Sequence, residues 1–428
     1  MTATLSFQSN TDSLTWAREK DLSDPLSSFR KQFHFPDEEN KQIYFAGHSL
    51  GLMPKKVQDY IQIELDSWKT YGVEGHFEGP HPWLPYHENI TQSFANLVGA
   101  KNSEVVAMNT LTVNLHLAMV SFYKPGKTKN KIFIEQHSFP SDKYAVDSQA
   151  RFHGYDPKQT VVEFKPSQGG MILTEADILE QIETNKDEIA LIMIGNCNYL
   201  SGQNFDLKKI TEFAHQYDIH VGVNLAHGAG NLELKLHDWG VDFAVWCSYK
   251  YLNSGPGGIA GCFIHDRHHH KKEIPRFEGW WGQNKQNRFK MGPEFDPIPT
   301  VEAWQLSNPP IFQLAALRAS MELFDQATMK KLRSRGDELT GYMAYLIQKK
   351  SAGKVEILNG DVSRGSMLCL RFKTGQTKIG DLFRAKGVIV DFREPDIIRG
   401  TPAPLYNSFE EVYRFSEQLA EIISEAKK

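Results

Sequence analysis

Between residues 104 and 264, short apolar runs rich in β-branched residues alternate with longer stretches whose apolar residues recur at helical spacing. Strands are predicted at 104–109, 131–136, 189–196, 220–226 and 241–248. Helices are predicted at 112–123, 174–185 and 206–218, the second with Thr174 and Asp177 at capping-box spacing. Repeated strand–helix–strand order predicts an α/β fold with a mostly parallel sheet and helices on both faces.

The pattern changes after about residue 310. The stretch 309–327, PPIFQLAALRASMELFDQA, starts with prolines and continues with helical periodicity, which predicts a long helix leaving the sheet. Three strand-like runs and two helical stretches follow, at 354–358, 366–372, 388–394, 377–386 and 408–426. We therefore expect an N-terminal segment (1–45) packing on both domains, a large α/β domain (46–310) and a small C-terminal α+β domain (311–428).

Composition and charge exclude several classes of function. A net charge of −4 over 428 residues gives no electrostatic basis for binding nucleic acid or a membrane surface. No apolar run reaches the roughly 18 residues of a membrane-spanning helix. The opening MTATLSFQSN lacks the basic and apolar segments of a secretory signal. The four cysteines show no CxxC spacing, so we expect no zinc site, no disulfide framework and a cytoplasmic protein.

One basic stretch, HDRHHHKKE (265–273), contains adjacent histidines. A metal site needs ligands that converge from suitable spacings and that surrounding groups hold in place. Adjacent histidines in a basic loop seldom meet these conditions. We expect a solvated turn at this stretch and no metal site in the protein.

Polar residues follow four of the predicted strands, which is where an open α/β sheet binds its ligands. The four strand ends carry Thr112; Phe139 and Asp142; Asn224 and His227; Tyr249 and Lys250. Three of these residues also have a structural interpretation. Thr112 fits a plain helix N-cap, Phe139 a core residue and His227 a hydrogen-bonded structural histidine.

Lys250 lies where the strand-like run VDFAVWCS gives way to the glycine-rich turn NSGPGG. Two interpretations are open for Lys250. In the first, its aliphatic stem lies on the core and its ammonium group reaches water. In the second, the amine is desolvated and forms a Schiff base. Pyridoxal phosphate (PLP) needs such an amine, a phosphate anchor, an aromatic plane and a partner for its pyridine nitrogen. The four strand ends together offer this set, with the amides near Thr112 as the phosphate anchor.

The stretch 236–265, LHDWGVDFAVWCSYKYLNSGPGGIAGCFIH, resembles the kynureninases, which are PLP enzymes of the aspartate-aminotransferase fold type. The resemblance continues through YFAGHSLGLMPKKV, MNTLTVNLH, FPSDKYA, NLAHGAGN, GWWGQ, RFKM, LSNPPI and TPAPLYNSFEEVY. It covers nearly the whole chain from about residue 40. It implies PLP fold type I, with a large sheet domain and a smaller C-terminal α+β domain.

The resemblance also implies an activity. Kynureninases hydrolyse the bond between the β and γ carbons of L-kynurenine or 3-hydroxy-L-kynurenine, giving L-alanine and anthranilate or 3-hydroxyanthranilate. This reaction belongs to tryptophan catabolism and NAD biosynthesis. By resemblance, Lys250 carries the cofactor and moves protons, while Tyr249 contacts the phosphate and assists proton transfer.

Further residue roles follow from the same resemblance. Cofactor contacts are implied for Leu111, Thr112, Phe139, Asp142, Asn224, His227, Trp280 and Asn308, with Thr112 on the phosphate and Phe139 stacked on the ring. Trp280 and Asn308 lie in stretches that usually reach the neighbouring subunit's site, which implies a homodimer. Arg399 would bind the substrate carboxylate, a task suited to guanidinium.

The resemblance assigns Ser49, His76 and Asn308 to the aromatic end of the substrate. Histidine and asparagine side chains can hydrogen-bond a ring hydroxyl. We therefore expect a preference for the 3-hydroxy substrate.

One residue departs from the family pattern. Kynureninases normally carry aspartate at the position of Asn224, where the carboxylate pairs with the protonated pyridine nitrogen. Losing a buried charge-assisted bond costs about 1.5–3 kcal/mol. We expect weakened catalysis, an altered reaction or compensation by a neighbouring group; an engineered or evolved variant would also explain the asparagine. Gly195 and Leu200 also differ from the polar residues usual in this loop, which favours a reshaped pocket.

Other functions stay open on the sequence alone. A cysteine desulfurase needs a thiol on a mobile loop, whereas Cys369 lies in the strand-like run SMLCLRF, where a buried inert thiol is expected. A cofactor-binding protein with little catalysis would fit Asn224. A structural protein whose lysine carries no cofactor is a further alternative.

Overall fold

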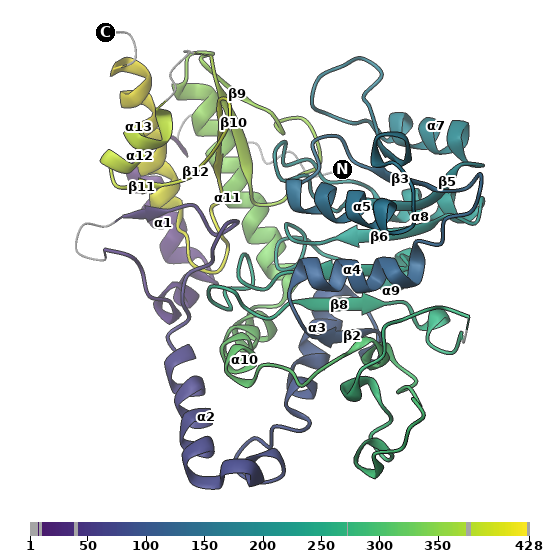
Figure 1. The fold of residues 1–428 in the computed structure, drawn as a ribbon. Coiled ribbons are helices and arrows are strands. Elements are labelled where there is room, and N and C mark those ends of the chain that lie inside the picture. The colour runs from purple at the N-terminus through teal and green to yellow at the C-terminus, as the bar shows by residue number, and fades with distance from the viewer. Residues whose placement is uncertain (1–6, 8–10, 38–41, 272, 374–377, 426–428) are drawn as a thin grey trace.

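The protein is described here by a computed structural model that covers residues 7, 11–37, 42–271, 273–373 and 378–425 (Figure 1). Its centre is a seven-stranded sheet with the order β2-β8-β7-β6-β5-β3-β4. The strands are β2 (Val105–Ala107), β3 (Lys131–Ile134), β4 (Val161–Glu163), β5 (Ile189–Gly195), β6 (His220–Asn224), β7 (Phe243–Trp246) and β8 (Gly261–Ile264). β3 to β7 pair in parallel, and β8 runs antiparallel to β7 and β2. The predicted mostly parallel α/β sheet is confirmed.

Helices cover both faces of this sheet, and others pack together in a separate core. The helices are α1 (Leu14–Ser23), α2 (Val57–Tyr71), α3 (Thr91–Val98), α4 (Leu111–Phe122), α5 (Pro140–Phe152), α6 (Pro157–Thr160), α7 (Glu175–Asn185), α8 (Leu207–His215), α9 (Leu236–Trp239), α10 (Ile311–Ala327), α11 (Met329–Lys350), α12 (Ile379–Ala385) and α13 (Phe409–Glu425). The separate core is that of α1, α11, α12 and α13. α7 begins with the predicted capping box between Thr174 and Asp177. Among the described helices, none has both the length and the apolar character needed to cross a bilayer.

Alternate residues of each central strand belong to two different cores. In β5, Ile192 and Ile194 join a core with α7 and α8, whereas Leu191 and Met193 join a second core with α4 and α5. Because side chains of a strand point alternately to opposite faces, β5 is buried on both sides, and this explains its continuous apolar sequence. The three layers hold the strand ends at fixed positions.

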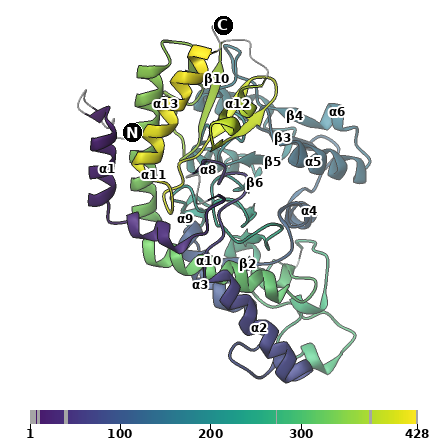
Figure 2. The ribbon, with the colours of Figure 1, turned by 90° about the vertical axis from the view of Figure 1, so that its left-hand side faces the viewer.

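A second body of structure is built around the four-stranded antiparallel sheet β12-β13-β10-β9. Its strands are β9 (Val355–Ile357), β10 (Leu368–Phe372), β12 (Asp391–Arg393) and β13 (Ile397–Gly400). Figure 2 shows α1, α11 and α13 side by side next to it. The N-terminal β1 (Ile43–Tyr44) pairs in parallel with β11 (Val388–Ile389), so residues from both ends of the chain meet there.

In this region one sequence prediction is wrong and one helix was not predicted. The run 388–394 is not one strand, because the chain leaves β11 at Ile389 and enters a different sheet at Asp391. The 22-residue helix α11 is present where no helix was predicted, and its buried Leu339, Met343 and Ile347 pack into the core of this body. The predicted domain boundaries stay a prediction.

Candidate active site

A pocket opens at the carboxyl ends of β3, β5, β6 and β7. It is lined by Leu111, Thr112, Glu135, Phe139, Ser141, Asp142, Gly195, Cys197, Tyr199, Asn224, Ala226, His227, Tyr249 and Lys250. Eight of these residues were predicted to bind or process a cofactor. They lie at or after the ends of β2, β3, β6 and β7, and the sheet brings these positions to one edge.

Lys250 follows β7 and directs its amine into the pocket. Its Nζ lies 3.3 Å from His227 Nε2 and 5.8 Å from the centre of the Phe139 ring. The side chain is half-buried because it faces the open pocket. Burial lowers the pKa of Lys250, and the nearby charges of Arg399 and Arg393 act in the same direction. A lower pKa increases the neutral, nucleophilic fraction of the amine.

His227 packs deep in the pocket wall and is 5% exposed. Burial and then the charge of Lys250 lower its pKa well below the ordinary value, so the ring is neutral at physiological pH. Among the described residues, its Nδ1 atom is buried without a hydrogen-bond partner. A neutral ring with a spare nitrogen can accept or donate one hydrogen bond to a bound group.

Asn224 and Asp142 form a buried, hydrogen-bonded pair in the same pocket as Lys250. Asn224 Nδ2 donates to Asp142 Oδ2 at 2.6 Å, and Asn224 Oδ1 accepts from the Ala226 amide at 2.8 Å. Burial raises the pKa of Asp142 to about 6, against the opposing effects of the Asn224 hydrogen bond and the Lys250 charge. Asp142 Oδ1 has no hydrogen-bond partner within the described chain. The pocket therefore keeps one carboxylate oxygen available beside the unusual asparagine.

The N-termini of α4 and α5 meet at the other end of the pocket. Thr112 Oγ1 lies 3.0 Å from Ser141 Oγ, so each helix contributes a hydroxyl in its first turn. The interpretation of Thr112 as a plain N-cap is wrong, because Thr110 is the N-cap of α4. Backbone amides and hydroxyls at two helix N-termini form a suitable site for a phosphate.

Glu135 lines the pocket and was not predicted. It follows β3, is 4% exposed, and its Oε2 accepts from the Gly195 amide at 3.0 Å. Burial raises its pKa to about 7. A side chain at Gly195 would meet Glu135, since a Cβ there would lie 2.8 Å from Oε1. The signal in the sequence was the same as for Lys250, a charged residue directly after an apolar strand.

Arg399 and Ser49 belong to a buried network and are not among the residues that line this pocket. Arg399 Nη1 donates to the Tyr199 carbonyl at 2.7 Å, and Tyr199 does line the pocket. Arg399 Nη2 and Ser49 Oγ both donate to Asp391. Asp391 was not predicted, because no local sequence pattern marks the residue of β12 that pairs with Arg399 of β13.

His76, Trp280 and Asn308 are also absent from the pocket lining that the structure describes. His76 ends the 3-10 helix Gly72–His76, and its ring lies 6.4 Å from Phe77. Phe77 is 6.1 Å from Phe289, which is 5.5 Å from Trp280, so these four rings form one cluster, called here the aromatic patch. Phe77, Trp280 and Phe289 are each at least 41% exposed. Asn308 is exposed on the loop that precedes α10.

The histidine-rich stretch lies at the opposite edge of the sheet, and the prediction of a solvated turn is wrong. His268 and His269 are 2% and 6% exposed. His268 Nε2 lies 2.8 Å from Asp242 Oδ1, and His269 Nε2 lies 2.9 Å from the Ile264 carbonyl. The turn folds back because buried carboxylates at this edge need partners.

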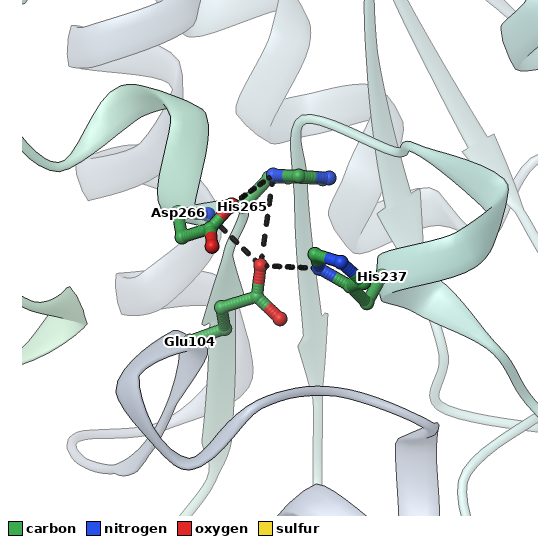
Figure 3. Close-up of side chains that lie close together, drawn as sticks. All are labelled: Glu104, His237, His265 and Asp266. Carbon is green, nitrogen blue, oxygen red and sulfur yellow. Dashed lines mark hydrogen bonds and ion pairs between the residues drawn. The ribbon is translucent and has the colours of Figure 1, made fainter.

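A second set of side chains converges at this edge, from the starts or ends of β2, β8 and α9 (Figure 3). Glu104 Oε1 lies 2.8 Å from His237 Nδ1 and accepts from the Asp266 amide at 2.9 Å. His265 Nδ1 lies 3.0 Å from Asp266 Oδ1. Lys101 pairs with Asp266 and its amide donates to Glu104 Oε2, so the carboxylates already have partners. The absence of a metal site stays a prediction.

Comparison with known proteins identifies the family of this chain. The Aminotransferase class-V family matches residues 43–391. A kynureninase of Myxococcus xanthus is 56% identical over 412 residues, which is 95% of this chain and 97% of that protein. A kynureninase of Koribacter versatilis is 50% identical over 94% of this chain and 96% of its own length. This chain belongs to the kynureninase family.

Solved structures show the fold that kynureninases share with other enzymes. The cystine C-S lyase C-DES, solved with its product cysteine persulfide, superposes with a TM-score of 0.75 at 16% identity, covering 89% of this chain and 97% of its own. The cysteine desulfurase CsdA of Escherichia coli gives a TM-score of 0.75 at 16% identity, with 93% and 98% covered. The fold is thus PLP fold type I, and at this identity the likeness carries no activity.

The cysteine desulfurase alternative requires a reactive, accessible thiol, and Cys369 does not have these properties. Cys369 lies in β10 and is 0% exposed, and burial raises its pKa. A buried thiol with a raised pKa is a poor nucleophile. The kynureninase family assignment is therefore favoured over the desulfurase alternative.

Proposed function

We propose that this protein is a PLP-dependent hydrolase that cleaves the Cβ–Cγ bond of L-kynurenine or 3-hydroxy-L-kynurenine, yielding L-alanine and anthranilate or 3-hydroxyanthranilate. The observation that carries the proposal is the amine of Lys250, which projects into a pocket between two helix N-termini and a buried carboxylate–amide pair. Relatives named kynureninase match nearly the whole chain and supply the substrate class.

The residues of the pocket fit pyridoxal phosphate. Asp142 Oδ1 and His227 Nδ1 are buried polar atoms without a partner in the described chain, and such atoms in a pocket indicate a bound polar group. Leu111, Thr112 and Ser141 would hold the phosphate, Phe139 would cover the ring, and Asn224 with Asp142 would face the pyridine nitrogen. When bound, PLP supplies an electron sink for the carbanions on either side of C–C cleavage.

The chain's own groups have distinct tasks in this reaction. Lys250 would attach the cofactor and then carry protons, because its pKa is lowered by burial. Tyr249 would contact the phosphate and assist proton transfer; its hydroxyl stays protonated because burial raises its pKa. Arg399 would bind the substrate carboxylate from the network next to Tyr199.

The aromatic end of the substrate would contact Ser49, His76 and Asn308. We infer a preference for the 3-hydroxy substrate, since the imidazole and the amide can hydrogen-bond the ring hydroxyl. His76 and Asn308 do not line the pocket of their own chain. They would reach the site from a second copy.

A homodimer in the cytoplasm completes the proposal. The aromatic patch exposes Phe77, Trp280 and Phe289, and Trp68 and Phe312 form a separate exposed ring pair. Contiguous exposed apolar side chains of this kind typically mark a protein interface. A second copy covering the patch would place His76, Trp280 and Asn308 at the neighbouring site. The proposed domains remain those of residues 1–45, 46–310 and 311–428.

The decisive experiment measures turnover and attachment on one preparation. Purified protein loaded with PLP should convert L-kynurenine to equal amounts of L-alanine and anthranilate. Borohydride reduction followed by peptide mass mapping should label Lys250. Absence of product together with an unlabelled Lys250 would refute the proposal, and comparable kcat/KM for the two kynurenines would refute only the substrate preference.

A further inference from the structure

We propose that Arg393 is a positioning residue for the substrate carboxylate. Without substrate, Arg393 and Arg399 both bind the carboxylate of Asp391. When the substrate carboxylate binds Arg399, Arg393 becomes the one arginine that holds Asp391. The inference rests on the proposed function, because it assumes that Arg399 binds the carboxylate of a kynurenine. It assigns a role to two residues of β12 that no resemblance indicated.

The antiparallel pair β12–β13 creates this arrangement. Asp391 lies directly opposite Arg399 in the register, and Arg393 lies two residues further along β12 on the same face. Side chains opposite each other on neighbouring strands interact most strongly, so Asp391 and Arg399 are partners by topology. Arg393 Nη2 reaches the same oxygen, Asp391 Oδ2, at 3.1 Å.

One carboxylate oxygen therefore serves several donors at once. Asp391 Oδ2 accepts from Arg399 Nη2, Arg393 Nη2 and Ser49 Oγ, and His48 Nε2 lies 3.6 Å from it. Although burial opposes ionisation, His48, Arg399 and Ser49 hold the pKa of Asp391 well below its ordinary value. Asp391 is thus a carboxylate anion already bound to the guanidinium that the substrate needs.

The balance of charges around Asp391 explains the role of Arg393. Arg399 with Asp391 alone is a neutral pair, and a substrate carboxylate would meet Asp391 as a like charge. Arg393 makes the set of three net positive, so a second carboxylate completes a neutral set of two anions and two cations. Arg393 and Arg399 both act electrostatically on Lys250 and His227, which places their charges near the pocket.

The hydrogen-bonding pattern points the same way. Within the described chain, Arg399 Nε and Arg393 Nε are both buried without an acceptor. Arg399 is 1% exposed and fixed by the Tyr199 carbonyl, whereas the Arg393 side chain is 39% exposed and has room to follow Asp391. The spare Nε–H of Arg399 can donate to the substrate carboxylate while Arg393 keeps its bond to Asp391, and charge-assisted bonds of this kind are strong.

The test distinguishes the contribution of the ligand's carboxylate to binding from that of the rest of the ligand. L-Alanine and L-alaninamide differ only in that the second lacks a carboxylate, and the visible spectrum of the PLP-loaded protein reports the binding of each. In Arg393→Gln, the Kd for L-alanine should rise about tenfold, while the Kd for L-alaninamide should stay within twofold of the wild type. With L-kynurenine, KM should rise by a similar factor.

Two further variants make the result specific. Arg393→Lys keeps the charge but not the forked geometry, so its Kd for L-alanine should lie between those of the wild type and Arg393→Gln. Arg384→Gln, an exposed residue of α12, removes the same charge away from the site and should change neither Kd. Equal weakening of both ligands in Arg393→Gln, or no weakening of L-alanine, would overturn the inference. Failure of the proposed function would differ, because the wild type itself would then show no response to L-kynurenine.

Discussion

Titratable side chains gather at both edges of the seven-stranded sheet, but the two edges differ in how their buried polar groups are hydrogen-bonded. At the carboxyl edge, Asp142 and His227 keep buried polar atoms without a partner in the described chain. At the other edge, Asp242 accepts from Arg267, His215 and the Val221 amide, with His268 2.8 Å away, and both Glu104 oxygens accept a hydrogen bond. Figure 3 shows how closely the groups around Glu104 converge.

This difference teaches where the fold places its binding capacity. Buried polar groups are normally hydrogen-bonded, and leaving one unpaired costs stability. At the amino edge, the buried carboxylates of Asp242 and Glu104 follow that rule, and their ion pairs join the chain around β2, β6, β7 and β8. At the carboxyl edge, buried atoms of Asp142 and His227 stay unpaired in the pocket, where a bound ligand would supply the missing partners. Binding sites commonly give up some stability in this way for function.

The largest effect is expected at the carboxyl edge from Lys250→Ala. Without the amine there is no attachment point for the cofactor and no proton carrier, so kcat for L-kynurenine should fall by at least about 10³-fold. The thermal unfolding midpoint of the cofactor-free protein should not decrease, because burial disfavours the charged amine and its contact in the described chain is a 3.3 Å approach to His227. Activity within about tenfold of the wild type would contradict the role of Lys250.

At the amino edge, Asp242→Asn should destabilise the cofactor-free protein by about 3 kcal/mol at pH 7, because it leaves Arg267 and its histidine neighbours without their anion. Burial opposes the ionisation of Asp242, but His215, His220 and His268 hold its pKa well below 3.8. Its contribution is therefore fully present above pH 3.8 and is lost as the pH falls toward the folded-state pKa. Urea unfolding at pH 7 measures the loss, and a variant as stable as the wild type would show that this cluster is not structural.

The opposite sign is expected for Glu135→Gln. Burial raises the Glu135 pKa from 4.5 to about 7, so the folded wild type loses stability as the pH rises through this interval. The glutamine variant keeps an oxygen for the Gly195 amide and lacks this titration. The cofactor-free variant should be more stable than the wild type at pH 8 by up to about 3 kcal/mol, with no difference at pH 4.5. A variant less stable at pH 8 would place Glu135 with the stabilising groups of the other edge.

The same contrast explains what could be predicted from the sequence. Lys250, His227 and Asp142 follow apolar strand-like runs, and parallel strands bring such positions to one edge, so local pattern and topology were enough. Asp391 and Arg393 could not be found this way, because Asp391 pairs with Arg399 of the neighbouring strand β13, which depends on register, and Arg393 belongs to the site only through Asp391. The buried histidines of 265–269 were misjudged because their carboxylate partners, Asp242 and Glu104, lie elsewhere in the sequence.

The smallest expected effect concerns Asn224→Asp, which tests whether the carboxyl edge already compensates for its missing charge. The new carboxylate would lie at hydrogen-bond distance from Asp142, since Asn224 Nδ2 is 2.6 Å from Asp142 Oδ2. Two carboxylates this close cannot both ionise, so one would hold a proton and the net gain in charge would be small. We expect kcat for L-kynurenine to rise less than about tenfold. No rise at all would refute a limiting role for Asn224, whereas a larger rise would show that Asp142 does not stand in for the missing aspartate.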